Sequence, residues 1–63
     1  MNKYRHYKGG IYTFIGIGAH TETRERLVAY YDEKGTLWFR PEKMFFGNVE
    51  VDGKTVKRFT PIS

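Results

Sequence analysis

No cysteine occurs in the 63-residue sequence. The chain therefore forms no disulfide and offers neither a thiolate nucleophile nor a cysteine-bound zinc site, which removes the usual sources of stability of small secreted domains. Long apolar runs are missing as well. No window approaches the ~18 consecutive apolar residues of a membrane span, and the first ten residues lack the apolar stretch of a secretory signal. We expect a soluble, cytoplasmic protein without a membrane partner.

Catalytic groups are also scarce. The only histidines are His6 and His20, and no closely spaced set of His, Asp and Glu accompanies them, so no metal site is expected. The seven carboxylates are scattered and form no evident pair of general acid and base. A chain this short buries only about 60% of the surface that it exposes when unfolded, which leaves no room for a deep pocket. These shortages argue against an enzyme and against a bound cofactor, and they allow one domain, residues 1–63.

Basic side chains, by contrast, are in excess. The chain has 11 Lys and Arg against 7 Asp and Glu, for a net charge of +4. The excess is concentrated in the first ten residues, at Lys3, Arg5 and Lys8. Such a charge attracts phosphate groups. The sequence nevertheless lacks the extended basic stripe that binds duplex nucleic acid tightly.

Short runs rich in β-branched and aromatic residues, separated by polar or glycine-containing turns, predict five strands. The runs are residues 11–19, 26–31, 36–40, 48–52 and 54–59. Pro41 ends the third run because it has no N–H to donate, and residues 41–46 are predicted to begin a single helical turn. Asp52-Gly53 predicts a tight hairpin turn. Residues 60–63 are too few for a further element.

These elements predict an all-β fold. The architecture that fits best is a small SH3-like five-stranded barrel with a single 3₁₀ or helical turn, because a closed barrel leaves no exposed sheet edge. In the first strand, alternation places Tyr12 and Phe14 on one face and Ile15 and Ile17 on the other. An OB-like barrel is the alternative, although it generally needs a longer chain and a helix.

Several motifs occur in a defined order along the chain. They are YRHYKGG at residues 4–10, HTET at residues 20–23, LWFRP at residues 37–41 followed by Met44-Phe45, and VDGK at residues 51–54 followed by Arg58-Phe59. In this order and spacing they resemble a small bacterial and phage family, domain of unknown function 1653. The resemblance covers nearly the whole chain and implies a small SH3-like β-barrel, but no established activity. Thr21 stands where the family tends to have serine, and Phe39 where valine is frequent.

The first candidate site combines aromatic and cationic side chains near the N-terminus. Its residues are Tyr4, Arg5, His6, Tyr7 and Lys8. Such a composition can stack against a planar ring and neutralise a phosphate. In the alternative interpretation, the two tyrosines cover the open end of the barrel and the cations only solvate the segment.

The second candidate site is a polar loop formed by His20, Thr21, Glu22 and Thr23. Loops carry function when a rigid scaffold positions them. Adjacent residues of an extended loop usually point apart, however, and no catalytic template is recognised. In the alternative interpretation, the two hydroxyls and the carboxylate cap backbone N–H groups of their own turn.

The third candidate site is Trp38 with Arg40. Alternation places these two residues on one face of the third strand and Leu37 and Phe39 on the other. If Leu37 and Phe39 face the core, Trp38 is left partly outside and can line a groove for stacking or peptide recognition. In the alternative interpretation, Trp38 packs against Met44, Phe45 or the N-terminal tyrosines.

Together these segments predict a non-catalytic binding module that takes a protein or a small anionic ligand on one face. The candidate ligand-binding residues are Tyr4, Arg5, His6, Tyr7, Lys8, His20, Thr21, Glu22, Thr23, Trp38 and Arg40. The alternative function is the binding of single-stranded nucleic acid or a nucleotide, which the same aromatic and cationic side chains would serve.

Overall fold

The structure is a computed structural model that describes residues 2–62; Met1 and Ser63, the ends of the predicted domain, lie outside the described residues. This part of the chain contains seven strands and one short helix. In chain order they are β1 (Lys3–His6), β2 (Ile11–Ala19), β3 (Arg26–Tyr31), β4 (Leu37–Pro41), α1 (Glu42–Phe45), β5 (Asn48–Val51), β6 (Lys54–Lys57) and β7 (Phe59–Ile62). The all-β class and the single helical turn predicted from the sequence are confirmed.

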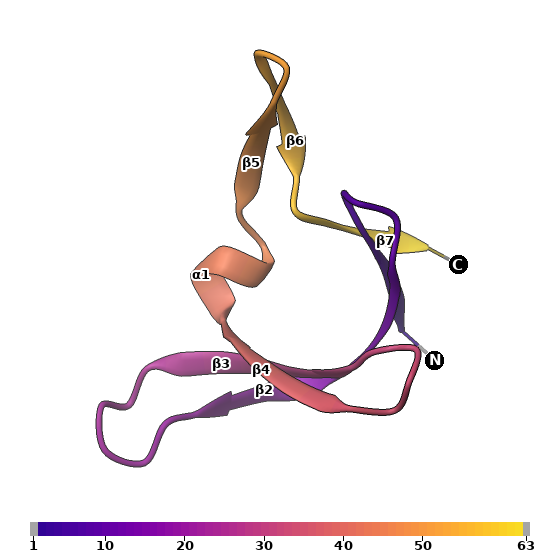
Figure 1. Cartoon of the computed structure of the whole chain (residues 1–63). Coiled ribbons are helices and arrows are strands. Elements are labelled where there is room, and N and C mark those ends of the chain that lie inside the picture. Colours follow the sequence, from indigo (N-terminus) through magenta and orange to yellow (C-terminus); the bar gives the residue numbers. More distant parts are fainter. Residues whose placement is uncertain (1, 63) are drawn as a thin grey trace.

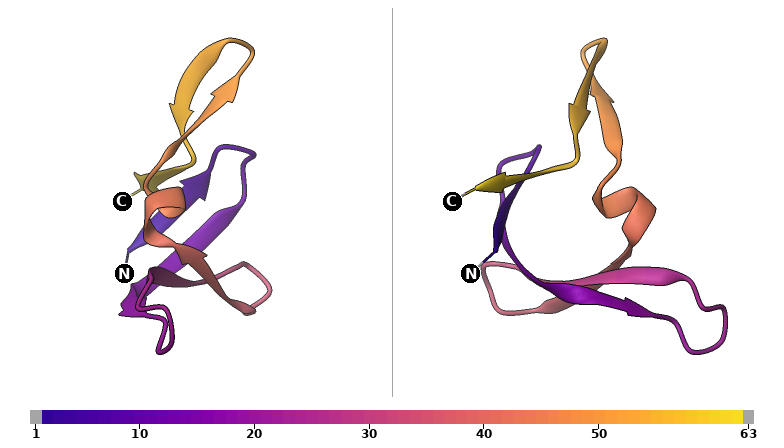
Figure 2. Two further views of the ribbon diagram at one scale, coloured as in Figure 1. Left: turned by 90° about the vertical axis from the view of Figure 1, so that its left-hand side faces the viewer. Right: turned by 180° about the vertical axis from the view of Figure 1, so that it is seen from behind.

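Five of the strands form one antiparallel sheet in the order β4-β3-β2-β1-β7, and β5 and β6 pair in a separate hairpin. The large sheet curves strongly (Figure 1). Its edge strands, β4 and β7, do not pair within the described residues 2–62, so the sheet is open. The closed five-stranded barrel predicted from the sequence is therefore wrong. The chain between α1 and β7 forms the β5–β6 hairpin, which stands away from the sheet in Figures 1 and 2 instead of bridging its edges.

Two strands of the sheet were not predicted. β1 and β7 have four residues each and pair with one another, with Tyr4 opposite Pro61 and His6 opposite Phe59. Each is stabilised by a neighbour at the other end of the chain, which no local pattern reports. The strand predicted over residues 54–59 therefore divides at Arg58, whose N–H donates to the Gly47 carbonyl at 3.0 Å. Residues 60–62, judged too few for an element, belong to β7.

The bounds of β2 and β3 match the prediction, and a β-bulge explains how β2 curves. The register of the β2–β3 ladder shifts at Ile15, between Phe14 and Gly16. A bulge inserts one unpaired residue, bends the strand and increases its twist. Ile15 is accordingly 53% exposed, and the even alternation predicted along this strand is broken there.

The hydrophobic core fills the concave side of the sheet and is mainly aromatic. Its buried side chains are Val28, Tyr30, Phe45 and Phe59, with Tyr4, Tyr12 and Phe14 packed against them. Directly after β4, α1 lies across the open side of the sheet (Figure 2). Phe45 is the buried residue of this helix. The rings of Phe45 and Phe59 stack with their centroids 4.1 Å apart. The segment after β4 is thus joined to β7 by side-chain packing.

Replacing Phe45 by alanine should destabilise the domain by about 3–5 kcal/mol, the usual cost of emptying a buried aromatic site. Because the stability of a small domain is of the same order, we expect most of the variant to be unfolded in water, as measured by urea titration. Met44→Ala, on the same helix but exposed, is the matched control and should unfold near the wild-type urea concentration. Equal midpoints for the two variants would contradict the packing described above.

Candidate functional site

A shallow cavity of about 230 Å³ opens beside the aromatic core. Its lining residues are Tyr12 of β2, Tyr30 of β3, Asp32 of the following turn, and Trp38 and Arg40 of β4. Tyr30 stands opposite Trp38 in the β3–β4 ladder. Residues opposite one another in a ladder project from the same face of the sheet, as do residues two apart along a strand. The pairing of β3 with β4 therefore assembles most of the cavity.

The register decides which face of β4 points inward. Trp38 and Arg40 share the face of the buried Tyr30, whereas Phe39 projects from the outer face and is 62% exposed. The arrangement considered from the sequence, with Leu37 and Phe39 toward the core, is therefore wrong. Alternation separates the two faces of a strand but does not say which one is covered, and here the buried residues of β3 decide. Trp38 still leaves 50% of its surface open to solvent at the cavity.

Asp32 holds Trp38 in place. The indole Nε1 donates to Oδ2 of Asp32 at 2.8 Å. The other carboxylate oxygen accepts the backbone N–H groups of Lys34 and Thr36, each at 2.9 Å. These bonds favour the ionised carboxylate and hold the pKa of Asp32 below its ordinary value of 3.8, the bond from Trp38 contributing most. One carboxylate thus fixes both the turn after β3 and the orientation of the half-exposed indole.

Arg40 and His6 both lie near the same core ring, that of Phe59. Arg40 Nε donates to the hydroxyl of Tyr30 at 3.2 Å, and its guanidinium carbon lies 5.8 Å from the centroid of the Phe59 ring. The His6 ring packs edge-on against Phe59, with the centroids 4.9 Å apart. Nδ1 of His6 accepts the backbone N–H of Lys8 at 3.2 Å, so this nitrogen carries no proton in the arrangement described.

The surroundings of His6 are positively charged. The pKa of His6 lies below its ordinary value of 6.5, first because of partial burial and then because of the charges of Arg40, Arg58 and Lys8. His6 also packs edge-on against Tyr12, a wall of the cavity, with the centroids 6.1 Å apart. Cations from three separate segments therefore act on His6, and one of them, Arg40, also lines the cavity.

The N-terminal candidate segment is divided between the two sides of the sheet. Tyr4 points into the core, where its ring centroid lies 5.2 Å from that of Phe45. Arg5, on the opposite face of β1, is exposed. Tyr7 and Lys8 are exposed beyond the end of β1, with Lys8 Nζ 5.8 Å from the centroid of the Tyr7 ring. The segment therefore meets the cavity chiefly through His6.

The loop of residues 20–23 lies apart from the cavity. It joins β2 to β3 beyond the pair Ala19–Arg26, whereas the cavity adjoins the opposite end of the same ladder, near the pair Thr13–Tyr31. Figure 1 shows this loop at the far tip of the β2–β3 hairpin. Strands advance by about 3.3 Å per residue, so most of the length of β3 lies between the loop and Tyr30 at the cavity. The three candidate segments do not converge on one face.

Polar groups of this loop cap its own backbone. His20 Nδ1 accepts the N–H groups of Glu22 and Thr23 at 3.1 and 3.3 Å, and Thr23 Oγ1 accepts the N–H of Glu25 at 3.2 Å. Thr21 donates its hydroxyl to the Glu22 carboxylate at 2.8 Å. These contacts agree with the capping interpretation for Thr23, and they add His20 as a cap that was not predicted.

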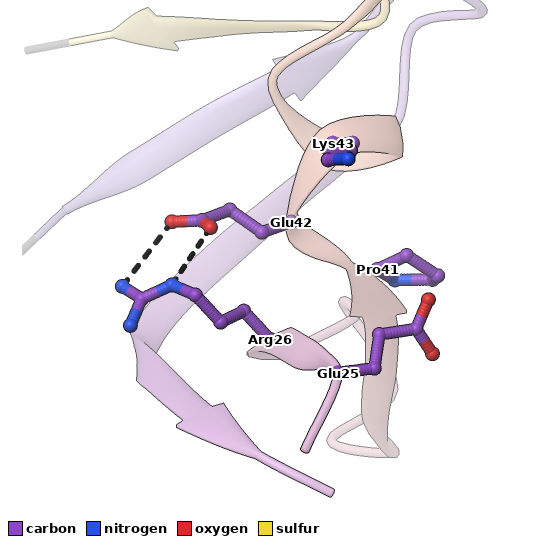
Figure 3. A pocket seen from close by; sticks show the side chains of 5 residues that line it. All are labelled: Glu25, Arg26, Pro41, Glu42 and Lys43. Atoms are coloured by element: carbon purple, nitrogen blue, oxygen red, sulfur yellow. Dashed lines mark hydrogen bonds and ion pairs between the residues drawn. The ribbon is translucent and has the colours of Figure 1, made fainter. Parts of the chain in front are cut away.

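A second hollow, of about 240 Å³, lies where β3 meets α1 and contains a charge pair (Figure 3). Arg26 Nε donates to one carboxylate oxygen of Glu42 at 2.8 Å, and Nη2 donates to the other at 3.4 Å. This pairing raises the pKa of Arg26 above its ordinary value, first through the hydrogen bond and then through the charge of Glu42. Both charges are thus satisfied internally, which makes this hollow a weaker candidate than the Trp38 cavity.

Two further properties of residues 2–62 bear on the site. No helix in this range is long and apolar enough to cross a membrane. No three His, Asp or Glu side chains in it gather closely enough to hold a metal ion.

The geometry can be set beside known proteins. A model of the family described as protein of unknown function (DUF1653) matches residues 2–61. The chain belongs to this family. Neither the curated proteins nor the solved structures give a match. The resemblance seen in the sequence is confirmed, and because the family description names no activity, any function must be argued from the cavity itself.

Three residues of the cavity were not predicted for this member of the family: Tyr12, Tyr30 and Asp32. A partial signal existed for Asp32, because an Asp shortly before a glycine, here Gly35, favours a turn capped by the carboxylate. Gly35 indeed has a positive φ of 85°. The two tyrosines lie in predicted strands but read locally as ordinary strand residues, and the register of neighbouring strands brings them to the cavity.

The free energy of unfolding should decrease as the pH falls below 6.5, the ordinary pKa of His6. The folded pKa is lower than the unfolded one, so in this range the unfolded chain binds the proton more readily. The stability that neutral His6 contributes is complete above pH 6.5 and is lost as the pH falls through the folded pKa. Urea unfolding at several pH values measures the effect, and His6→Gln should flatten the profile. A profile unchanged by that substitution would show that His6 does not cause this pH dependence.

Asp32→Asn should loosen the Trp38 side chain, because an amide accepts more weakly than a carboxylate and its NH₂ group cannot accept the indole N–H. Trp38 is the only tryptophan of the chain, so acrylamide quenching of its fluorescence reports on it alone. We expect faster quenching in Asp32→Asn. Glu33→Gln, one position along the same turn, is the control and should match the wild type. Identical quenching in all three proteins would show that Asp32 does not hold the indole.

Proposed function

We propose that the chain is a non-catalytic binding module whose site is the Trp38 cavity. The observation that carries the proposal is a half-exposed indole held by a carboxylate at 2.8 Å, inside a hollow that also contains a positioned guanidinium. Exposed tryptophan and arginine are the side chains that most often dominate binding energy at recognition sites. The two groups are fixed before a ligand arrives, which lowers the entropic cost of binding.

The cavity suits a ligand with a planar group and a negative charge. A ring can stack on Trp38 while an anionic group approaches Arg40. The Nε–H of Arg40 is engaged by Tyr30, but a guanidinium has further N–H donors on its terminal nitrogens. A small aromatic acid or an acidic segment of a protein has this chemistry.

The proposal of a non-catalytic role rests on what the titratable groups already do. Asp32 accepts three hydrogen bonds from its own turn and from Trp38. Nδ1 of His6 accepts a backbone N–H. Groups held in this way serve the architecture of the site rather than proton transfer.

A nucleotide or single-stranded nucleic acid is the second candidate ligand. It is favoured by Arg40, Arg58 and Lys8, whose charges all act on His6 beside the cavity. Stacking of a base on Trp38, with phosphates near these cations, follows the usual pattern of single-strand binding. Affinity would then fall steeply as the salt concentration rises.

The same proposal includes an SH3-like architecture and a cytoplasmic location. An open variant of the SH3-like architecture is supported by four successive antiparallel neighbours and a last strand, after the helical turn, that returns beside the first. A cytoplasmic location is supported by the lack of cysteine.

Binding can be tested by NMR titration of the isotope-labelled domain with two probe sets: mononucleotides with short single-stranded oligonucleotides, and aromatic carboxylates with short acidic peptides. Shifts of the Trp38 indole N–H and the Arg40 Nε–H with either set support the proposal. Nucleotide shifts that fade between low and moderate salt favour the second candidate. No shift with either set, or shifts confined to residues 20–23, would count against the cavity as the site.

Trp38→Ala should weaken binding of whichever probe shifts the spectrum by more than about 1 kcal/mol, roughly fivefold or more in Kd, while the domain still folds. Tyr31→Ala, which removes an exposed aromatic ring from the outer face of β3, is the matched control and should bind as the wild type does. Equal losses in the two variants would mean that the binding is not local to the cavity.

A further inference from the structure

β4 presents an unusual edge to solvent. It is the last strand of the sheet on one side. Its residues Leu37, Trp38 and Phe39 are three consecutive large apolar side chains with 42%, 50% and 62% of their surface exposed. An exposed apolar edge is a template for pairing with another strand, and proteins usually protect such edges with charge, proline, bulges or a cover.

The turn before β4 shows which of its backbone groups are unpaired. The N–H of Asp32 donates to the carbonyl of Thr36 at 3.0 Å, so these two residues form a hydrogen-bonded pair. Bonded and non-bonded pairs alternate along an antiparallel ladder. By this alternation and the register of β3 with β4, Trp38 is bonded to β3, whereas the N–H and C=O groups of Leu37 and Phe39 point away from it toward the open edge.

β7, at the other edge of the sheet, differs in this respect. The N–H of Tyr7 donates to the carbonyl of Arg58 at 2.9 Å. The same alternation along the β1–β7 register then turns Phe59 and Pro61 outward. Pro61 has no N–H, and Phe59 is buried. The β7 edge thus lacks one outward N–H because of its proline, as is usual for protected edges. In β4 both outward N–H groups, those of Leu37 and Phe39, are present.

We propose that β4 pairs antiparallel with β4 of a second copy of this chain. In the register that uses the outward groups fully, Leu37 of one copy stands opposite the partner's Phe39 in both directions. Each of these pairs can exchange both of its N–H···O bonds. Trp38 then stands opposite the partner's Trp38 on the two-fold axis.

The side chains fit this register. In the proposed ladder between the two β4 strands, Trp38 occupies a non-hydrogen-bonded position. At such positions opposing side chains approach most closely, and aromatic pairs stabilise a sheet. On the outer face, Leu37 contacts the partner's Phe39. Arg40 stands opposite the partner's Thr36, so no like charges oppose one another within the strand.

Charges at the two ends of β4 also match. The turn before the strand carries Glu33 and Lys34, and α1 after it begins with Glu42 and Lys43. Antiparallel pairing brings the turn of each copy toward α1 of the other. Lys34 then lies on the side of the partner's Glu42, a carboxylate that also binds Arg26 of its own chain, and Glu33, which also accepts the N–H of Ile11, lies on the side of the partner's Lys43. The edge is therefore complementary to itself, as an interface about a two-fold axis requires. A second copy fits it better than an unrelated strand.

The oligomeric state tests the proposal. Light scattering after size exclusion should give twice the chain mass of 7.5 kDa for the wild type as its concentration is raised. Phe39→Pro removes one outward N–H but no bond of the β3–β4 ladder, and it should be monomeric with a folded NMR spectrum. Phe39→Val keeps the N–H and is the matched control, which should still form dimers. A monomeric wild type up to millimolar concentration, or a folded and dimeric Phe39→Pro, overturns the proposal.

The register can be tested without a proline. The chain has no cysteine, so Trp38→Cys introduces a single thiol at the position predicted to face itself. Opposed Cβ atoms in such pairs lie about 4.5–5.5 Å apart, close to the separation that a disulfide spans. Mild oxidation should yield a covalent dimer of Trp38→Cys much faster than of Arg40→Cys, whose predicted neighbour is Thr36. Equal rates for the two variants, or no crosslink at position 38, overturn the register.

Discussion

Phe45 and Phe59 stack face to face, with ring centroids 4.1 Å apart and planes 10° from parallel. Because β4 and β7 do not pair in the described part of the chain, this stack holds the helical turn to the last strand where a closed barrel would use a backbone ladder. His6 and Arg40 also lie near the Phe59 ring. Tyr30 belongs both to the buried core and to the lining of the cavity, so the position of the cavity side chains depends on the packing behind them.

Hydrogen bonds to rigid parts of the fold hold the side chains of the cavity in place. Trp38 is tied to Asp32, and Asp32 is tied to the backbone of its own turn. Arg40 is tied to the hydroxyl of Tyr30, whose ring is buried. A side chain fixed in this way loses little freedom when a ligand binds. The loop of residues 20–23 differs from the cavity in this respect, because its polar side chains form hydrogen bonds with the backbone of their own turn.

β4 contributes to two surfaces because its side chains and its backbone point in different directions. Trp38 and Arg40 project into the cavity, while the outward backbone groups of Leu37 and Phe39 lie in the plane of the sheet. Pairing of two copies through this edge would bring two cavities side by side, with a Trp38 at the border of each. Ligand binding and self-association would then meet at one residue, although neither proposal depends on the other.

The sequence by itself determined the strands that carry their own signal. Residues 11–19 and 26–31 have the alternation and turn residues that define β2 and β3, and Pro41 marks the change from strand to helical turn. The family could also be named from its motifs. The separation of Trp38 and Arg40 from Leu37 and Phe39 followed from the two-residue period of a strand.

Only the tertiary structure decided the rest, because each remaining feature depends on residues far apart in the chain. β1 and β7 are strands because they pair with each other across nearly the full sequence. The buried residues of β3 determine which face of β4 points inward, and the sheet stays open because β4 and β7 do not pair in the described part of the chain. The cavity itself joins Tyr12, Tyr30 and Trp38 through strand register. Local patterns encode period and turn chemistry, whereas register and closure are set by how the whole aromatic core packs.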